Sequence, residues 1–442
     1  MNTLQDSIDL TRVGPGTVMG NFMRQYWIPA AKSSELQRDG APMRLMLLGE
    51  KLIAFRDTQG RVGVMDHRCP HRCASLFLDR NEEDGIRCIY HGWKFDVEGN
   101  CVDMPSVPAS QDFKDKVKAR AFKVAERNGL IWVYMGPRQE APPLPMVEAT
   151  LLDERNVSIS FMQRRCNWMQ ALEGDIDTSH FGFLHVGHLD PDNVPSGHPL
   201  EHTASERAPE YHVRDAPWGT SYGAYRSVRP NTTYWRFANY MFPFWTQTPQ
   251  GEFPRNIQAR AWVPLDDEHT MMIFWKQNIG QAGTNAPLKD GKPLGGTRPA
   301  PDWQPVSTDW LGRYRTVAND TNDWLIDREA QRSNRIYSGI DHVALQDQAV
   351  TESMGAITDH GFEHLGPGDL MIARTRRRAL QAARAFAGGA PAPLVDQPEI
   401  YMGARSGYFE LPSSVPWQDA YESQMQTVQR APQAAAELAP AK

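Results

Sequence analysis

The sequence is poor in cysteine and contains no long apolar run. Its five cysteines, at positions 69, 73, 88, 101 and 166, are an odd number and too sparse for a disulfide framework. No window holds the roughly 18 apolar residues that a membrane-spanning helix needs. Residues 1–9 carry acidic side chains and lack the apolar stretch of a signal peptide. We therefore expect a cytoplasmic protein with no membrane partner, whose thiols are reduced or bound to metal.

Concentrated positive charge is also missing. The formal net charge is -6, and acidic and basic residues are interspersed along the chain. The single basic run, Arg374 to Arg378, fits the solvated face of a helix, so we expect no nucleic-acid partner. A dinucleotide-binding fingerprint is absent as well, because Gly14-Pro-Gly16 follows no predicted strand and opens no G-x-G-x-x-G turn.

Short apolar runs separated by turns predict a small all-β domain over residues 43–136. Asp57 to Gly60 and Asp96 to Asn100 have the composition of hairpin connections. Residues 1–42 form a polar lead broken by glycine and proline. The proline-rich segment 137–145 excludes a helix and is a stiff linker between domains.

Residues 146–430 then predict a larger domain with a sizeable antiparallel sheet and several helices. The expected strands cover residues 157–163, 220–228, 233–241, 256–263 and 270–277. The expected helices cover residues 166–184, 310–332 and 364–387. Residues 280–305 read as a long loop or lid, and the Ala/Pro-rich tail 431–442 is expected to be disordered.

Two short motifs in the β domain offer metal ligands. Cys69-Pro-His71 and Cys88-Ile-Tyr-His91 each supply one thiolate and one imidazole. Zinc sites usually pair like ligands within a loop, so this spacing fits structural zinc poorly, although zinc stays open as an alternative. The spacing matches a Rieske [2Fe–2S] centre, in which two cysteines bind one iron and two histidines bind the other.

A second group of candidate ligands lies in the larger domain, where Asp177 precedes His180 by three residues and His185 follows by five. Asp177 and His180 share one face of a helix. His185 lies about 140° further round an ideal helix, so both histidines reach one metal only if the helix ends or widens, and we expect that break at Gly182. Two imidazoles and a carboxylate suit non-haem iron(II). Two ordinary histidines in an amphipathic helix remain the alternative.

These segments together resemble the Rieske ring-hydroxylating oxygenases of the phthalate 4,5-dioxygenase type. The resemblance is carried by His67 to Arg72, by Cys88 to Trp93 and by Asn167 to His180. It implies an α+β fold, with an N-terminal all-β Rieske domain followed by a helix-grip catalytic domain. Respiratory Rieske centres add a disulfide, but His91 to Phe95 holds no partner for Cys73, which we interpret as a small buried thiol.

The resemblance also implies residue roles. Cys69, His71, Cys88 and His91 would bind the [2Fe–2S] cluster. His180 and His185 would bind a mononuclear iron(II), and Asp177 would bridge His180 to the cluster ligand His91 of a neighbouring subunit. Asp347 falls at the position of the third iron ligand, in a segment where Asp341 and Glu352 are rivals.

The implied reaction is cis-dihydroxylation of an aromatic carboxylate such as a benzoate or phthalate, with O2 as co-substrate. Electrons would come from NAD(P)H through a separate reductase with FMN and a [2Fe–2S] cluster, and the oxygenase would be a homotrimer or a stacked hexamer. Arg207 and Arg236 are our candidates for binding the substrate carboxylate. A Rieske O-demethylase of a methoxy- or phenoxy-substituted aromatic acid is the alternative, and a pure electron-transfer Rieske protein is a third reading.

Overall fold

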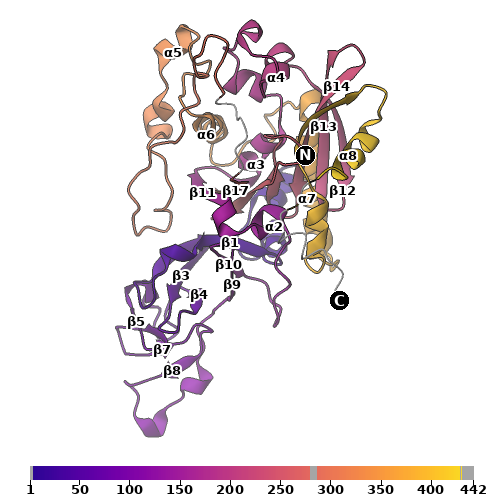
Figure 1. Cartoon of the computed structure of the whole chain (residues 1–442). Helices are drawn as coiled ribbons and strands as arrows, with labels where there is room; N and C mark the ends of the chain where they lie inside the picture. The colour runs from indigo at the N-terminus through magenta and orange to yellow at the C-terminus, as the bar shows by residue number, and fades with distance from the viewer. Residues whose placement is uncertain (1–2, 279–285, 429, 431–442) are drawn as a thin grey trace.

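The computed structural model describes residues 3–278, 286–428 and 430. Figure 1 shows two parts: β5, β7 and β8 lie at one end of the molecule, α4 and α5 lie at the other, and β1 and β10 run between them. The tail expected to be disordered, and part of the expected lid, lie outside the described residues. No helix among the described residues is long and apolar enough to cross a membrane.

The first part is built from three small antiparallel sheets, as expected for an all-β domain. One sheet has the order β2-β3-β4, the second β5-β6-β7-β8 and the third β1-β10-β9. The strands are β1 (Trp27–Lys32), β2 (Met43–Leu47), β3 (Glu50–Arg56), β4 (Val62–Asp66), β5 (Arg80–Glu82), β6 (Gly85–Arg87), β7 (Lys94–Phe95), β8 (Cys101–Asp103), β9 (Lys123–Arg127) and β10 (Leu130–Tyr134). Strand β1 lies inside the segment expected as a lead, yet it pairs with β10. Our division at residues 43–136, 137–145 and 146–430 stays a proposal.

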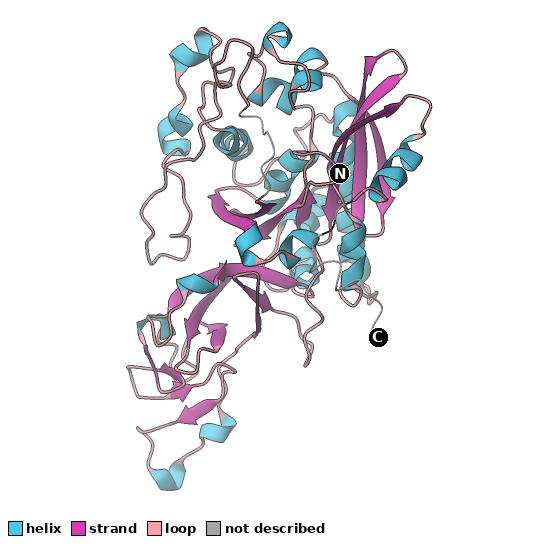
Figure 2. Cartoon of the chain, viewed as in Figure 1, coloured by secondary structure: helices cyan, strands magenta, loops and turns pink. Residues whose placement is uncertain are grey.

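The second part contains the large antiparallel sheet that the sequence predicts. Its strands run in the order β11-β17-β16-β15-β14-β13-β12, and β18 pairs with β14. They are β11 (Val157–Arg164), β12 (Glu210–Ala216), β13 (Gly219–Arg229), β14 (Thr232–Met241), β15 (Trp245–Gln247), β16 (Gln258–Pro264), β17 (Thr270–Gln277) and β18 (Gly407–Pro412). Figure 2 shows longer helices beside this sheet and short helical turns in the first part.

The α-helices of the described residues are short, except for α7. They are α1 (Leu4–Thr11), α2 (Val18–Met23), α3 (Trp168–Ile176), α4 (Glu201–Ser205), α5 (Arg328–Arg332), α6 (Val343–Ser353), α7 (Leu370–Ala387) and α8 (Trp417–Met425). The long helix predicted over residues 310–332 is wrong: this stretch holds a 3-10 turn, Asp320–Leu325, and α5. Asp323 and Trp324 both have φ of 50°, which interrupts any right-handed helix there. The last predicted helix begins at Leu370, because Gly366-Pro367-Gly368 precedes it.

A buried ion pair ties the second part together at the end of α3. Glu173 on α3 accepts two hydrogen bonds from Arg376 on α7, from Nε at 2.5 Å and from Nη2 at 2.7 Å. Arg376 also pairs with Glu363. Two other arginines of the basic run at residues 374–378 also have partners. Arg374 pairs with Asp215, and Arg378 lies over the ring of Phe242.

We expect the Arg376→Met variant to be destabilised by about 3–5 kcal/mol, because it leaves the Glu173 carboxylate buried without a cation. The matched control is Arg374→Met on the same helix, whose exposed pair with Asp215 is expected to contribute less than about 1 kcal/mol. Urea unfolding followed by tryptophan fluorescence measures both. Equal losses in the two variants would contradict this role of the buried pair.

Candidate active site

The segment with the two candidate histidines leaves the α-helix early and then widens. Asn167 caps α3 through a hydrogen bond from the Met169 N–H, and the helix ends at Ile176. Phe181–His185 forms a π-helical turn. Because π-helical hydrogen bonds join residues five apart, His180 and His185 fall on the same face. The sequence predicts that the helix ends or widens at Gly182; the α-helix instead ends at Ile176, six residues earlier, and Gly182 lies within the π-helical turn.

Three side chains converge at this turn. The Nε2 atoms of His180 and His185 lie 3.1 Å apart. Oδ1 of Asp347, on α6, lies 3.1 Å from Nε2 of His185 and 3.6 Å from Nε2 of His180. One ligand atom from each residue therefore falls within 4.8 Å of the other two, which is the arrangement of a facial two-histidine, one-carboxylate metal site.

The two rivals of Asp347 point elsewhere. Asp341 is exposed. Glu352 is buried, but its Oε1 accepts a hydrogen bond from the Arg165 N–H and its Oε2 accepts one from Trp324 Nε1, each at 2.8 Å. Of the three candidates, Asp347 alone reaches the histidines.

Neighbouring groups orient both imidazoles. Nδ1 of His180 lies 3.3 Å from Oδ2 of Asp177. Nδ1 of His185 lies 2.6 Å from Oε1 of Gln346, whose amide nitrogen donates to the Ile340 carbonyl. Since a carboxylate and an amide oxygen only accept, each Nδ1 carries the hydrogen and each Nε2 lone pair is free for a metal.

The charges of the triad support the same arrangement. Burial alone would raise the pKa of Asp347, but the charge and hydrogen bond of His185, with His180 and Arg164 adding, hold it well below its usual range. Burial alone would lower the pKa of His180, but the hydrogen bond with Asp177 and the charge of Asp347 raise it. Asp347 is therefore an anion, the form that binds a cation.

The two Cys/His loops have matching backbone turns. Cys73 N–H donates to the Cys69 carbonyl at 2.9 Å, and Gly92 N–H donates to the Cys88 carbonyl at 2.8 Å. The rings of His71 and His91 lie 4.3 Å apart, and Trp93 stacks on His71 at the same distance.

The thiols of this pair of loops differ in their surroundings. The hydrogen bond between the two buried thiols, Cys69 and Cys88, lowers the pKa of Cys88 to about 6. Cys73 is exposed, not buried as expected, because it closes the turn with φ of 61° and points outward. All five cysteines are free.

Comparisons with known proteins show the family to which both parts of the chain belong. The family model "LigXa C-terminal domain like" matches residues 133–437, and the "Rieske [2Fe-2S] domain" model matches residues 26–120. The 3-chlorobenzoate-3,4-dioxygenase oxygenase subunit of Comamonas testosteroni is 52% identical, over 97% of this chain and 100% of the relative. The phthalate 4,5-dioxygenase oxygenase subunit of Pseudomonas putida is 37% identical, over 88% of each chain.

The chain belongs to the Rieske non-haem iron oxygenases. Among solved structures, NdmA of Pseudomonas putida CBB5, in its QL mutant with caffeine, matches with a TM-score of 0.53 at 18% identity. The match covers 90% of this chain and 99% of the other, and at this identity it supports the fold alone.

The oxygenase has a cavity of about 430 Å³ beside the triad. Its walls are mostly apolar, and they include His180, His185 and Asp347. Further lining residues come from the strands, from the π-helical turn, from α6 and from the segment at residues 299–303, namely Phe161, Met162, Phe181, Tyr222, Met272, Phe274, Pro299, Pro301, Trp303, Val343 and Ala344. A flat apolar molecule can thus lie next to the metal position.

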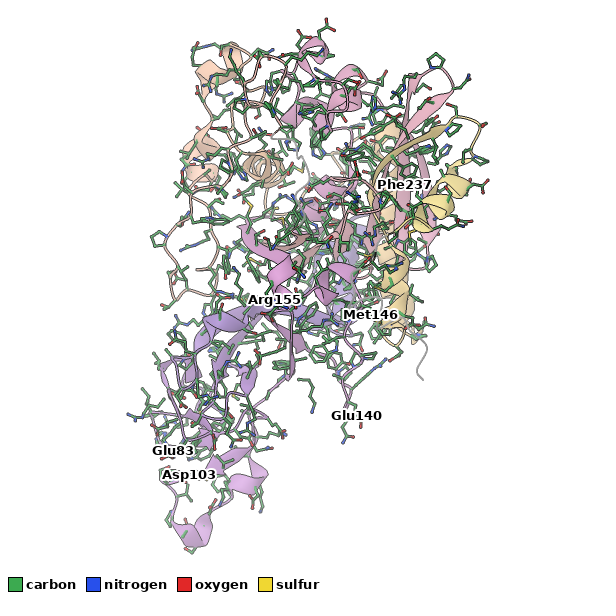
Figure 3. The ribbon with its side chains drawn as sticks, in the orientation of Figure 1. Glu83, Asp103, Glu140, Met146, Arg155 and Phe237 are labelled. Carbon is green, nitrogen blue, oxygen red and sulfur yellow. The ribbon has the colours of Figure 1, made fainter. Side chains whose placement is uncertain are left out.

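Arg236 is the predicted substrate arginine that lines this cavity. It is buried, its Nε has no partner among the residues that the structure describes, and its guanidinium carbon lies 5.4 Å from the ring centre of Phe181. Its neighbour on β14, Phe237, labelled in Figure 3, stacks on Phe409 in the core, so Arg236 faces the other side of the sheet. Burial and the nearby charge of Arg236 lower the pKa of Arg226 to about 10. No carboxylate pairs with either arginine among the described residues.

Arg207, the other predicted substrate arginine, is used differently. Its two terminal nitrogens donate to the carbonyls of Gly187 and Leu189, at 3.1 Å and 3.0 Å, and it is not among the described residues that line the cavity. Arg207 therefore supports the chain just after the π-helical turn. Sequence reasoning missed Arg164, Arg260 and His342, which do line the cavity. Arg260 shares one face of β16 with Gln258 and Trp262, while the alanines between them face the other way, a period-two pattern that was available in the sequence.

Proposed function

We propose that this oxygenase adds both atoms of O2 to the ring of an aromatic carboxylate, giving a cis-diol. The main support is Arg236, a buried cation that faces an apolar cavity beside the triad and has no carboxylate partner in the part of the chain that the structure describes. Such a cation binds a carboxylate favourably, since its own burial is then compensated. Two relatives named for 3-chlorobenzoate and phthalate support the same class of substrate.

In this proposal His180, His185 and Asp347 hold a mononuclear iron(II), which supplies the site of O2 activation when it is bound. Asp177 and Gln346 hold the imidazoles in the tautomer that leaves Nε2 free. Arg236 binds the substrate carboxylate, and the apolar walls keep the ring in a water-poor space. Arg207 keeps a supporting role only.

In this proposal the [2Fe–2S] cluster is held by Cys69, His71, Cys88 and His91. The cluster receives electrons from a separate NAD(P)H reductase with FMN and a [2Fe–2S] centre. Strands β5, β7 and β8 lie in one part of the molecule, and α3 and α6 lie in the other (Figure 1). This separation supports electron transfer between subunits of a head-to-tail homotrimer. Exposed apolar side chains beside the cluster loops suit such a contact: Leu78 is 61% exposed, Ile89 59% and Tyr90 55%.

Product mass tests the reaction. Purified oxygenase with a generic reductase is given benzoates, phthalates and methoxybenzoates, and oxygen uptake is measured with the product. Gain of two oxygens and two hydrogens supports the proposal. Loss of CH2 with formaldehyde release would replace it with O-demethylation.

We expect Arg236→Gln to weaken binding of the aromatic carboxylate by about 10- to 100-fold, because a charge-assisted hydrogen bond contributes about 1.5–3 kcal/mol. The control is Arg229→Gln on the neighbouring strand β13, whose side chain is exposed and paired with Glu410. Calorimetric titration of the oxygenase with benzoate measures both, and benzamide, which lacks the charge, should bind the wild type and Arg236→Gln alike. Unchanged benzoate binding in Arg236→Gln would remove the main support for the substrate class.

A further inference from the structure

Among the described residues, three arginines line the cavity, and they differ in their contacts. Arg164 donates from Nη1 to Thr351 Oγ1 on α6 at 3.3 Å, and its guanidinium carbon lies 4.8 Å from the ring centre of Trp262. Arg260 forms an ion pair with Asp175, with Nη1 and Oδ1 2.5 Å apart. Arg236 has no carboxylate partner among the described residues. Arg236 is thus a cation of the cavity that has no ion pair among the described residues, whereas a second cation on the same wall, Arg260, is already paired.

Asp175 is held firmly in the position that neutralises Arg260. Its Oδ2 accepts hydrogen bonds from Thr246 Oγ1 at 2.6 Å and from Trp262 Nε1 at 3.0 Å, while Oδ1 accepts from Arg260. With three donors and a side chain that is 11% exposed, the carboxylate cannot turn away to release the arginine. Asp175 also lines the cavity, so its negative charge faces whatever binds there.

Arg260 would be a competent anion ligand without this carboxylate. Its guanidinium carbon lies 4.4 Å from the ring centre of Phe274, so its plane is fixed against a cavity wall. Its Nε is buried and has no partner among the described residues. Removing the charge of Asp175 would leave Nη1 with only the long hydrogen bond to Thr248 Oγ1, at 3.5 Å, among the described residues, and the arginine would then present donors to an anion in a fixed plane.

We propose that Asp175 is a specificity-determining residue, which cancels the second cation of the cavity and restricts the oxygenase to aromatic acids with a single carboxylate. This inference rests on the proposed function, because it presupposes that Arg236 binds a substrate carboxylate. A second carboxylate on the ring would have to leave water, would find Arg260 already paired and would meet the like charge of Asp175.

The Asp175→Asn variant tests this inference. Asparagine keeps the shape and leaves an amide oxygen for Thr246 and Trp262, but it removes the negative charge. Calorimetric titration of the holo-oxygenase with benzoate and with phthalate needs no turnover. We expect the wild type to bind benzoate more tightly than phthalate. In Asp175→Asn, the ratio of the phthalate Kd to the benzoate Kd should fall by about tenfold or more.

Two variants of Arg260 serve as controls. In the double variant Asp175→Asn/Arg260→Gln the gain for phthalate should disappear, because the freed cation is gone. Arg260→Gln alone leaves the carboxylate unpaired, so the same ratio should rise above the wild-type value, and this result decides the matter if Asp175→Asn does not fold. Thermal unfolding of each variant checks its folding.

The possible outcomes separate the role of Asp175 from the proposed function. An unchanged ratio in folded Asp175→Asn, or a gain that persists in the double variant, would overturn the role of Asp175, and so would a wild type that binds phthalate as tightly as benzoate. In those cases benzoate binding by the wild type would leave the proposed function standing. If the wild type binds neither acid, the proposed function fails and the inference fails with it.

Discussion

Replacing Asp347 with alanine is expected to remove about one iron per chain and to abolish product formation, while the two irons of the [2Fe–2S] cluster and their visible absorption remain. The physical reason is that Asp347 supplies the only negative charge among the three converging ligand atoms. Two neutral imidazoles alone bind iron(II) weakly, and water would replace the carboxylate at an exposed coordination position. Iron analysis, the visible spectrum and product formation measure the three parts of this expectation.

The matched control for Asp347→Ala is Asp341→Ala. Asp341 lies six residues earlier in the same segment and is exposed, so its loss should change neither iron content nor turnover. The result that contradicts our ligand assignment is specific: full iron content in Asp347→Ala, or loss of one iron in Asp341→Ala. Loss of the cluster spectrum in Asp347→Ala would instead mean that the variant is misfolded, which thermal unfolding would reveal independently.

The iron ligands could be predicted from sequence because metal chemistry allows few residue types at few spacings. The spacing of Asp177, His180 and His185 identified them as a group of candidate ligands. Because both imidazoles can reach one metal only if the helix is irregular, the sequence also predicted an irregular helix. The path of the chain was not predictable. Whether the helix ends at Ile176 and turns as a π-helix depends on contacts such as Gly182 against Arg207, whose Cβ lies 3.3 Å from the Cβ that a larger residue would place there.

The substrate arginines show the opposite case. Arg207 and Arg236 are equivalent in the sequence, as cations among aromatic residues in a strand-rich region. The pairing of β14 with β13 and β18 turns Phe237 into the core and Arg236 into the cavity. Arg207 instead precedes β12 and donates to two backbone carbonyls. These differences arise from contacts between distant segments, which local sequence patterns do not encode.

The Asp177→Asn variant is expected to keep both metal centres loaded but to slow coupled turnover on the order of 100-fold. This is the upper end of the loss of activity expected when a group that orients a metal-binding imidazole is replaced. Asp177 accepts hydrogen bonds from the Ser179 and His180 N–H groups and lies 3.3 Å from Nδ1 of His180. Asparagine can keep the backbone bonds, but its amide nitrogen then faces Nδ1, which also carries a hydrogen. His180 loses its anionic partner, and the proposed bridge to the cluster of the neighbouring subunit is broken.

Single turnover of the pre-reduced oxygenase separates this effect from loss of iron. With substrate and O2 present, the cluster of the wild type should reoxidise as product forms, whereas reoxidation and product formation in Asp177→Asn should both be slower on the order of 100-fold. Asp192→Asn, an exposed aspartate beyond the same turn, is the control and should behave as wild type. Rapid cluster oxidation with normal product yield in Asp177→Asn would show that electrons reach the iron by another route. Slow oxidation with iron content intact would locate the defect in electron transfer, because the iron that accepts the electron would still be present.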